Sequence, residues 1–305
     1  MQKVGGPRDE MLERFWVQFF KQVFSTYSTT QQRILDIACG YGAVTGHALT
    51  TANDLKPEFS LQLFGLDSSP AVLQEVRKRF PSLNCIAASA DSLPVSDHAF
   101  DIVTSQFGVE YAGPGALSEA ARIVKPGGVM AVVMHKRDGS IYRECSENFK
   151  ALEGVRQSNI LHYFAGIFRT AQAIQQGNAG EQSFRRADEE FSRAVAAIED
   201  IFRQFGKDAA EGMVFRLYND IAHMYRRFNV YDPDEVFNWI EIMGNDIDTY
   251  AGRMASMLNS ALDEQGLQRI KADLTVRNFE IRTQDVLTMG KVSIPAAWVL
   301  IADKR

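Results

Sequence analysis

Short apolar runs recur at intervals through the first half of the chain and again near its end. Runs of this kind, without strict polar alternation, are typical of parallel strands that are buried on both faces of a sheet. The segments between them have helix-forming composition. The pattern therefore predicts an α/β fold with a mostly parallel sheet. The predicted strands lie at 34–37, 61–66, 85–88, 100–105 and 129–133, followed by two closing strands within 279–302.

Two other regions follow a helical period. From Arg8 to Tyr27, apolar positions three or four residues apart describe an amphipathic helix with a strongly aromatic face. The same period recurs between Arg137 and Asp273, where Gly177-Asn178-Ala179-Gly180 breaks the chain and Asp232-Pro233-Asp234-Glu235 is typical of a helix start. We therefore expect an N-terminal helix in 1–30, a sheet core in 31–136, a helical insertion in 137–273 and closing strands in 274–305.

The positions of the insertion, the N-terminal helix and the closing strands in the sequence suggest a role for each. The insertion follows the fifth strand, so it should leave the sheet at its carboxyl edge and cover a site there as a lid. The N-terminal helix has two alternative roles: it closes over a ligand, or it packs on the flank of the sheet. The closing strands should be separated by a turn at Met289-Gly290 and by Pro295.

The segment from Ile34 to Gly42 contains the most informative turn. Its apolar residues suit a buried strand, and Gly40 and Gly42 let the backbone bend sharply and approach a ligand at the start of a helix. Taken alone, the spacing of Gly40, Gly42 and Gly46 also fits a dinucleotide-binding loop or a turn without a ligand.

Polar residues after the next strands narrow these alternatives. Asp67 ends the second predicted strand, where a carboxylate can accept hydrogen bonds from both hydroxyls of a ribose. Asp91 and Ser92 follow the third strand, where an acid can accept from the exocyclic amine of adenine. The fourth strand opens with Phe-Asp-Ile-Val, and a Lys125-Pro126-Gly127-Gly128 turn precedes the fifth. A dinucleotide dehydrogenase does not require this whole order.

In these features, residues 32–134 resemble the class I S-adenosylmethionine-dependent methyltransferases, in particular the branch of ubiquinone-biosynthesis and similar small-molecule enzymes. The resemblance covers about a third of the chain. It implies a Rossmann-like seven-stranded sheet in which the last strand is reversed, with S-adenosylmethionine as cofactor and S-adenosylhomocysteine as product. One departure is Ala38, which stands where the family often has a further glycine.

The resemblance also implies roles for the cofactor residues. Asp36 and Gly40 would lie by the methionyl end, Asp67 would hold the ribose and Asp91 the adenine amine. Asp36 and Asp91 have an alternative role as caps of the next turn or helix, and Phe107 as ordinary core. The predicted cofactor residues are Asp36, Ala38, Gly40, Gly42, Asp67, Ser68, Asp91, Ser92, Gln106 and Phe107.

Methyl transfer needs an acceptor that is aligned with the methyl group, deprotonated and shielded from water. His135, just past the fifth strand, is the best-placed base, and Glu110 and Tyr111 follow the fourth strand. A solvent-facing or loop role is the alternative for each. Without an acidic cluster after the fourth strand, we expect no magnesium and no structural metal. Candidate substrate residues in the insertion are Tyr142, His162, Tyr163, His223 and Arg226.

Composition excludes several partners. The 305-residue chain has a formal net charge of −5 without a basic stripe, which disfavours nucleic acid and anionic membrane. No apolar run approaches the roughly 20 residues of a membrane span, so we expect a cytoplasmic protein. Its three scattered cysteines suit reduced thiols.

The sequence therefore predicts a methyltransferase that acts on an oxygen, nitrogen or carbon atom of a small, partly apolar molecule beneath a helical lid. Two alternatives stay open. The same fold could modify transfer RNA or a protein, or it could be a catalytically silent partner that scaffolds another methyltransferase. The substrate, the acceptor atom and a homodimer built by the aromatic faces are left undecided by the sequence.

Overall fold

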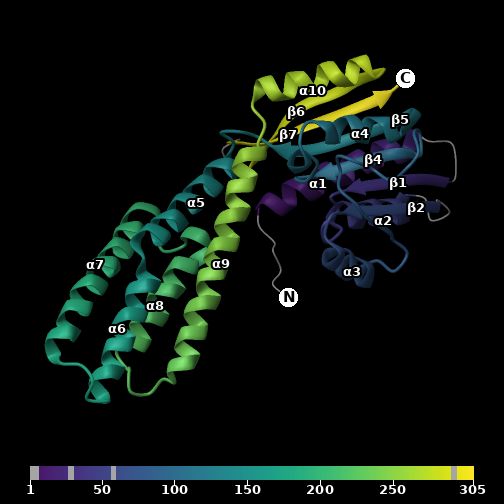
Figure 1. The fold of residues 1–305 in the computed structure, drawn as a ribbon. Coiled ribbons are helices and arrows are strands. Elements are labelled where there is room, and N and C mark those ends of the chain that lie inside the picture. Colours follow the sequence, from purple (N-terminus) through teal and green to yellow (C-terminus); the bar gives the residue numbers. More distant parts are fainter. Residues whose placement is uncertain (1–6, 27–30, 56–59, 290–293) are drawn as a thin grey trace. The chain divides into compact units, whose positions relative to one another are not determined.

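The computed structural model describes residues 7–26, 31–55, 60–289 and 294–305, and the chain forms two compact units (Figure 1). The first unit comprises Met1–Tyr142 and Ser260–Arg305, and the second comprises Arg143–Asn259. The predicted turn at Gly290 and the predicted end of the first helix at Tyr27 lie outside the described residues.

A seven-stranded sheet forms the centre of the first unit, in the order β3-β2-β1-β4-β5-β7-β6. Strands β1 to β5 pair in parallel, whereas β7 runs antiparallel to both β5 and β6. The predicted sheet with a reversed last strand is therefore confirmed. The strands are β1 (Gln31–Ile37), β2 (Ser60–Asp67), β3 (Asn84–Ala87), β4 (Phe100–Gln106), β5 (Val124–His135), β6 (Phe279–Met289) and β7 (Ile294–Lys304).

Alternating residues of the central strands enter two separate cores, one on each face. In β1, Leu35 and Ile37 join one core, while Ile34 joins the other. Helices α4 (Gly115–Ile123) and α10 (Glu264–Val276) contribute to the first core. The second core takes apolar residues from α1 (Pro7–Thr26), α2 (Ala43–Leu55) and α3 (Pro70–Arg79). The sheet is therefore covered on both faces, as a parallel sheet requires.

The start of β5 differs from the expected turn. The structure places Lys125-Pro126-Gly127-Gly128 within the strand, as an irregularity in the pairing with β4 between Phe100 and Ile102. Gly127 has φ +78°, and a Cβ on Gly128 would lie 2.8 Å from the carbonyl oxygen of Asp101. The chain therefore bends within β5 at these residues, and the strand begins earlier than the sequence indicates.

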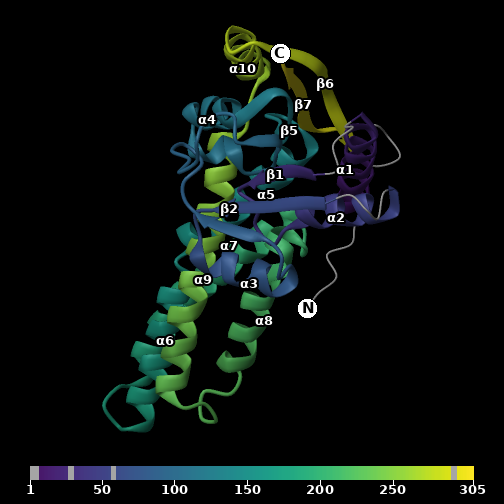
Figure 2. The same cartoon turned by 90° about the vertical axis from the view of Figure 1, so that its right-hand side faces the viewer.

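The second unit is helical and has a core of its own (Figure 2). Phe164 and Phe168 are fully buried, and they contact further aromatic rings within this unit. Gly177, at φ +75°, lies between the first long helices. The helices that build this unit are α5 (Ser140–Ser158), α6 (Ile160–Gln175), α7 (Glu181–Phe205), η2 (Ala209–Gly212), α8 (Met213–Tyr225) and α9 (Pro233–Ser260).

Candidate functional site

The carboxyl ends of β1, β2, β3 and β4 meet at one edge of the sheet, where open α/β folds bind their ligands. A cavity of about 200 Å³ opens at this edge. Three predicted cofactor residues line it: Asp67, Ser68 and Ala38, the last of which departs from the family's usual glycine. The lining consists of Ala38, Leu66, Asp67, Ser68, Ala88, Ser89, Ala90, Gly108, Tyr111 and Ala112.

The turn after β1 adopts a left-handed backbone at several positions. Ala38 has φ +54°, Gly40 φ +51° and Gly42 φ +76°. Space around Gly40 is open, since a Cβ there would meet no atom within 4 Å. A Cβ on Gly42 would instead lie 2.7 Å from the Phe80 ring and 2.8 Å from Val76. Gly40 is thus free to face a ligand, whereas Gly42 allows close packing against α3.

Asp67 connects the first two turns of the sheet edge. Its Oδ2 accepts a hydrogen bond from the backbone N–H of Gly40 at 3.0 Å, and its Oδ1 accepts one from Ser69 at 2.9 Å. A carboxylate has about four acceptor positions, so two remain for a ligand. The side chain lines the cavity, and the neighbouring Ser68 is exposed.

Asp36 lies deeper, at 3 % exposure. It accepts hydrogen bonds from the hydroxyls of Thr45 and Thr104, both at 3.2 Å. Burial raises the pKa of this carboxyl to about 7, although the two hydroxyls lower it in part. Asp36 is therefore a fixed acid that titrates near neutral pH.

The end of β4 brings the N-terminal helix to the same edge. Trp16 is fully buried, and its Nε1 donates a 2.6 Å hydrogen bond to Oε1 of Gln106. Helix α1 therefore packs on a face of the sheet and contacts a predicted cofactor residue, while its closure over a ligand stays a prediction. Phe107 follows at φ +52° and packs on the ring of His135, with centroids 4.4 Å apart.

His135 and Glu110 form a buried pair. Nδ1 of His135 lies 2.8 Å from Oε1 of Glu110, and the backbone N–H of His135 donates to the same oxygen at 2.9 Å. Tyr111 approaches the imidazole edge to face, at 5.7 Å between centroids. Oε2 of Glu110 is buried and has no hydrogen-bond partner among the residues that the structure describes. The three predicted catalytic candidates therefore lie together.

This pair has a definite chemical capacity. As a carboxylate, Glu110 only accepts hydrogen bonds, so it holds the proton of His135 on Nδ1. Nε2 is then the basic nitrogen of the ring. The open acceptor on Glu110 suits a donor from water or from a ligand, because buried polar atoms rarely stay unpaired.

The adenine-side candidates, Asp91 and Ser92, are exposed. They follow directly on the cavity-lining segment 88–90, and the N–H of Ser92 donates to the carbonyl of Ser89 at 3.3 Å. This turn is therefore at the rim of the cavity.

Four of the candidate substrate residues lie on helices α5, α6 and α8, and the fifth, Arg226, directly follows α8. Tyr142 is half-buried at the end of the first unit's N-terminal segment. His162 is exposed on α6 beside the ring of Tyr163, and His223 is exposed on α8. Arg226 lines a cavity of about 400 Å³ within the helical unit, between α6, α7 and α8. Neither His162 nor His223 lines this cavity.

Sequence reasoning missed several residues that shape the edge. Thr45 and Thr104 hold Asp36, and a Cβ on Gly108 would lie only 2.3 Å from Cβ of Ala38. The threonines carry no local signal, since hydroxyl residues are common in helices and strands. Gly108 directly follows the predicted Gln106 and Phe107, and that position could have drawn attention to it.

The described residues offer neither a metal site nor a membrane-spanning helix. Across 7–26, 31–55, 60–289 and 294–305, no group of three or more His, Cys, Asp or Glu side chains could hold a metal ion. No helix within the same ranges has the length and apolarity to cross a membrane.

Comparisons with known proteins agree on the sheet core. Residues 35–132 match the family described as methyltransferase domain. A ubiquinone/menaquinone biosynthesis C-methyltransferase of Campylobacter jejuni is 32 % identical over 150 residues, which cover 48 % of this chain and 61 % of that protein. A demethylmenaquinone methyltransferase of Renibacterium salmoninarum is 35 % identical over 103 residues, covering 33 % and 40 %. The matches thus span less than two thirds of either relative.

A solved structure from Methanococcus maripaludis, described as an S-adenosyl-L-methionine-dependent methyltransferase, aligns with 97 % of this chain and 90 % of its own. The TM-score is 0.41 at 14 % identity. The family match, the two sequence relatives and the sheet order lead to one conclusion about the first unit. Its sheet core resembles a methyltransferase domain over residues 35–132, and S-adenosylmethionine is the cofactor that this resemblance implies.

Proposed function

We propose that this protein transfers the methyl group of S-adenosylmethionine to a small, partly apolar molecule that carries an acidic hydroxyl group on an aromatic ring. The observation that carries the proposal is the buried pair of His135 and Glu110 beside the carboxyl edge of the sheet. The methyl donor supplies an electrophilic methyl group, and the chain must bind, orient and deprotonate the acceptor.

The residues at the sheet edge fit the cofactor. The cavity of about 200 Å³ is lined by Asp67, whose carboxylate keeps acceptor capacity for the ribose hydroxyls. Open space at Gly40 leaves room for a ligand close to the backbone. Asp36, as a carboxylate, would hold the amino group of the methionyl end through the charge-assisted hydrogen bonds that such pairs make. Asp91 would accept from the adenine amine.

The base is assigned to Nε2 of His135. Glu110 holds Nδ1 at 2.8 Å and thereby fixes both the tautomer and the ring. When a phenolic hydroxyl gives its proton to Nε2, the electron pair left behind makes the oxygen, or the ring carbon next to it, nucleophilic. The methyl carbon would then be joined to this nucleophile as its bond to sulfur is lost; where the ring carbon is methylated, the hydrogen on that carbon would leave as a proton and the oxygen would regain one. His135 later returns its proton to water.

An aromatic acceptor is favoured by the surroundings of this base. The imidazole ring lies between Phe107, at 4.4 Å, and Tyr111, at 5.7 Å. Aromatic side chains of this kind receive a flat ring well. The names of the two relatives point the same way, since both describe methylation in quinone biosynthesis. The helical unit is proposed to act as the lid that excludes water during the reaction.

The test is calorimetric titration of the full chain with S-adenosylmethionine and S-adenosylhomocysteine, followed by a mass assay of acceptors. We expect micromolar binding and a product 14 mass units heavier from hydroquinones or catechols, as one methyl replaces one hydrogen, and no such product from their fully O-methylated ethers. The O-methylated ethers are the matched control, because they keep the ring but lack the hydroxyl proton.

Each part of the proposal has a result that contradicts it. If well-folded protein binds neither ligand, the enzyme function is wrong and the scaffold alternative replaces it. If cofactor binds but transfer RNA or a protein is methylated in preference to every small phenol, the acceptor class is wrong.

A further inference from the structure

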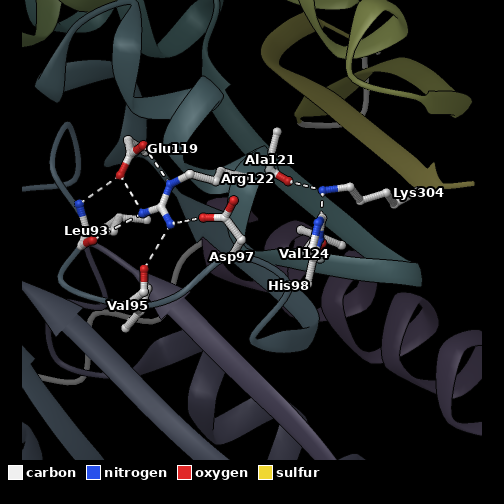
Figure 3. A network of polar contacts seen from close by, with 9 residues as sticks. All are labelled: Leu93, Val95, Asp97, His98, Glu119, Ala121, Arg122, Val124 and Lys304. Carbon is white, nitrogen blue, oxygen red and sulfur yellow. Dashed lines mark hydrogen bonds and ion pairs between the residues drawn. The ribbon is translucent and has the colours of Figure 1, made fainter.

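The guanidinium group of Arg122 uses all five of its N–H donors (Figure 3). Nε and Nη2 donate to the two carboxylate oxygens of Glu119, at 2.9 and 2.8 Å. Nη1 donates to the carbonyl of Val95 at 2.9 Å and to Asp97 at 2.7 Å, and Nη2 also donates to the carbonyl of Leu93 at 3.2 Å. A group with no donor left to offer does not bind a ligand, so its role is to hold the loop between β3 and β4.

Glu119 completes the hold on the same loop. Its Oε2 accepts the N–H of Leu93 at 3.0 Å, so the Glu119–Arg122 pair binds both backbone groups of Leu93. The guanidinium hydrogen bonds lower the pKa of Glu119, which therefore stays ionised and keeps this grip at neutral pH. Leu93 itself is buried. Bidentate pairs between arginine and carboxylate are among the strongest and most directional polar contacts in proteins.

The pair is anchored to rigid structure. Both residues lie on α4, whose Ala116, Ala120 and Ile123 are fully buried against the sheet. The far end of the loop is held as well, since Nδ1 of His98 lies 3.0 Å from the carbonyl of Val124 (Figure 3). The loop is therefore held along its length by α4 and by the first residue of β5.

The held loop carries the adenine-side residues. Residues 88–90 line the cavity at the sheet edge, and Asp91 and Ser92 follow directly, immediately before Leu93. Asp91 is exposed, and burial therefore does not fix its direction. Only two peptide bonds separate it from the clamped Leu93, so the clamp limits the positions that its carboxylate can reach.

We infer that Glu119 and Arg122 are positioning residues that fix Asp91 for the exocyclic amine of adenine and so make the site select adenine over hypoxanthine. This inference rests on the proposed cofactor site. Adenine offers an amine donor to the carboxylate, whereas hypoxanthine presents an oxygen at the same place and would repel it. A loose loop could still stack on the purine ring but would lose this discrimination.

The experiment compares two ligands on four proteins. S-adenosylhomocysteine and its hypoxanthine counterpart, S-inosylhomocysteine, are titrated by calorimetry into the native chain, Arg122→Lys, Glu119→Gln and the control Arg282→Lys. Arg282 pairs with Asp303 on the β6–β7 surface, away from the loop. We expect the native chain to prefer adenine at least about tenfold, and both clamp variants to fall to within about threefold. The control should keep the native preference.

The outcomes separate the inference from the function on which it rests. If the native chain binds neither ligand, the proposed function fails and takes this inference with it. If the native chain prefers adenine and both clamp variants retain that preference, the inference alone is overturned. Thermal unfolding and hydrogen exchange of residues 89–98 show that a variant is folded, and faster exchange of the Leu93 amide is expected in Glu119→Gln. Should Arg122→Lys fail to fold, the milder Glu119→Gln decides.

Discussion

Two polar clusters of the first unit, one at the carboxyl edge of the sheet and one around Arg122 toward its amino edge, differ in how completely their polar groups are satisfied. At the carboxyl edge, Asp36 is a buried acid with a raised pKa, Glu110 keeps an unpaired buried oxygen, and Ala38 has a left-handed backbone. Toward the amino edge, Arg122 has every donor engaged and Lys304 donates to the carbonyl of Ala121. The carboxyl edge combines a left-handed backbone with open acceptors, whereas every donor of the Arg122 cluster is engaged, although the buried Nε of Arg33 beside it has no hydrogen-bond partner among the described residues.

This difference teaches which edge has been shaped for stability and which for binding. Unpaired buried groups and left-handed residues cost free energy that a fold tolerates mainly where a ligand compensates for them. A saturated cluster has nothing to gain from a ligand. Removal of an unpaired buried group or of a left-handed side chain at the carboxyl edge should therefore spare or raise stability even where it reduces function. Changes in the Arg122 cluster should reduce stability and spare function, unless they reach the site through the loop.

The largest expected effect comes from His135→Ala. Removal of the base should lower kcat on a phenolic acceptor by about 10²- to 10⁴-fold, the usual contribution of general acid–base catalysis, with S-adenosylhomocysteine affinity unchanged within about twofold. Steady-state kinetics and calorimetry on the same preparation measure the two effects. The matched control is His47→Ala, a change in α2 that should leave kcat near native. Equal loss in both variants would remove His135 from the mechanism.

A smaller loss is expected for Asp67→Ala. The substitution removes the acceptor for the N–H groups of Gly40 and Ser69 as well as the proposed ribose contacts. Cofactor affinity should fall by about 10- to 100-fold, the range for one or two hydrogen bonds to a charged group. Calorimetry with S-adenosylhomocysteine measures this, with the exposed Asp285→Ala on β6 as control. An unchanged Kd for Asp67→Ala would show that the cavity is not the ribose site.

Titration of Asp36, the proposed partner of the methionyl amino group, should make cofactor binding depend on pH. Its pKa of about 7 in the folded protein means that the carboxylate needed by an ammonium group is lost as pH falls through 7. Cofactor affinity should therefore drop about tenfold between pH 8 and pH 6. Asp36→Asn should bind weakly at both pH values and lose this dependence, as calorimetry in two buffers will show.

The raised pKa of Asp36 affects stability in the opposite direction, because the carboxylate that should favour cofactor binding opposes folding. Because the folded pKa of Asp36 lies above the unfolded value of 3.8, ionisation of this group opposes folding increasingly as pH rises from 4 to 7. Asp36→Asn should thus raise Tm at pH 8 by several degrees and change it little at pH 4. A lower Tm at pH 8 would mean that the two threonine hydrogen bonds outweigh the burial of charge.

Much of the first unit could be predicted, because its information is local. Apolar runs gave the strands, and Asp67 and Gly40 stand beside strand ends that the sequence marks clearly. The hydrogen bonds of Asp36 with Thr45 and Thr104 join residues on three different elements. No short sequence motif can therefore predict them.

The helical unit shows the same limit. Its helix starts follow from Pro233 and its neighbours, but the cavity beside Arg226 exists only through the packing of three helices. Periodicity places a residue on a face, and only tertiary packing decides what that face meets. The sequence could therefore name Arg226 as a candidate but could not separate it from His162 or His223.

The smallest expected effect tests the strain in the cofactor turn. A Cβ on Gly108 would lie 2.3 Å from Cβ of Ala38, so Gly108→Ala should destabilise the fold by about 1–3 kcal/mol, as overpacking does. Ala38→Gly removes both the clashing atom and the cost of its positive φ, and should alone change stability by less than about 1 kcal/mol, since glycine also gains entropy in the unfolded chain. In the double variant Gly108→Ala with Ala38→Gly, the other atoms near the new methyl group are 3.4 Å away or more. Denaturant unfolding should therefore show a coupling that recovers most of the loss; additive effects would mean that the turn moves as a whole and stores no local strain.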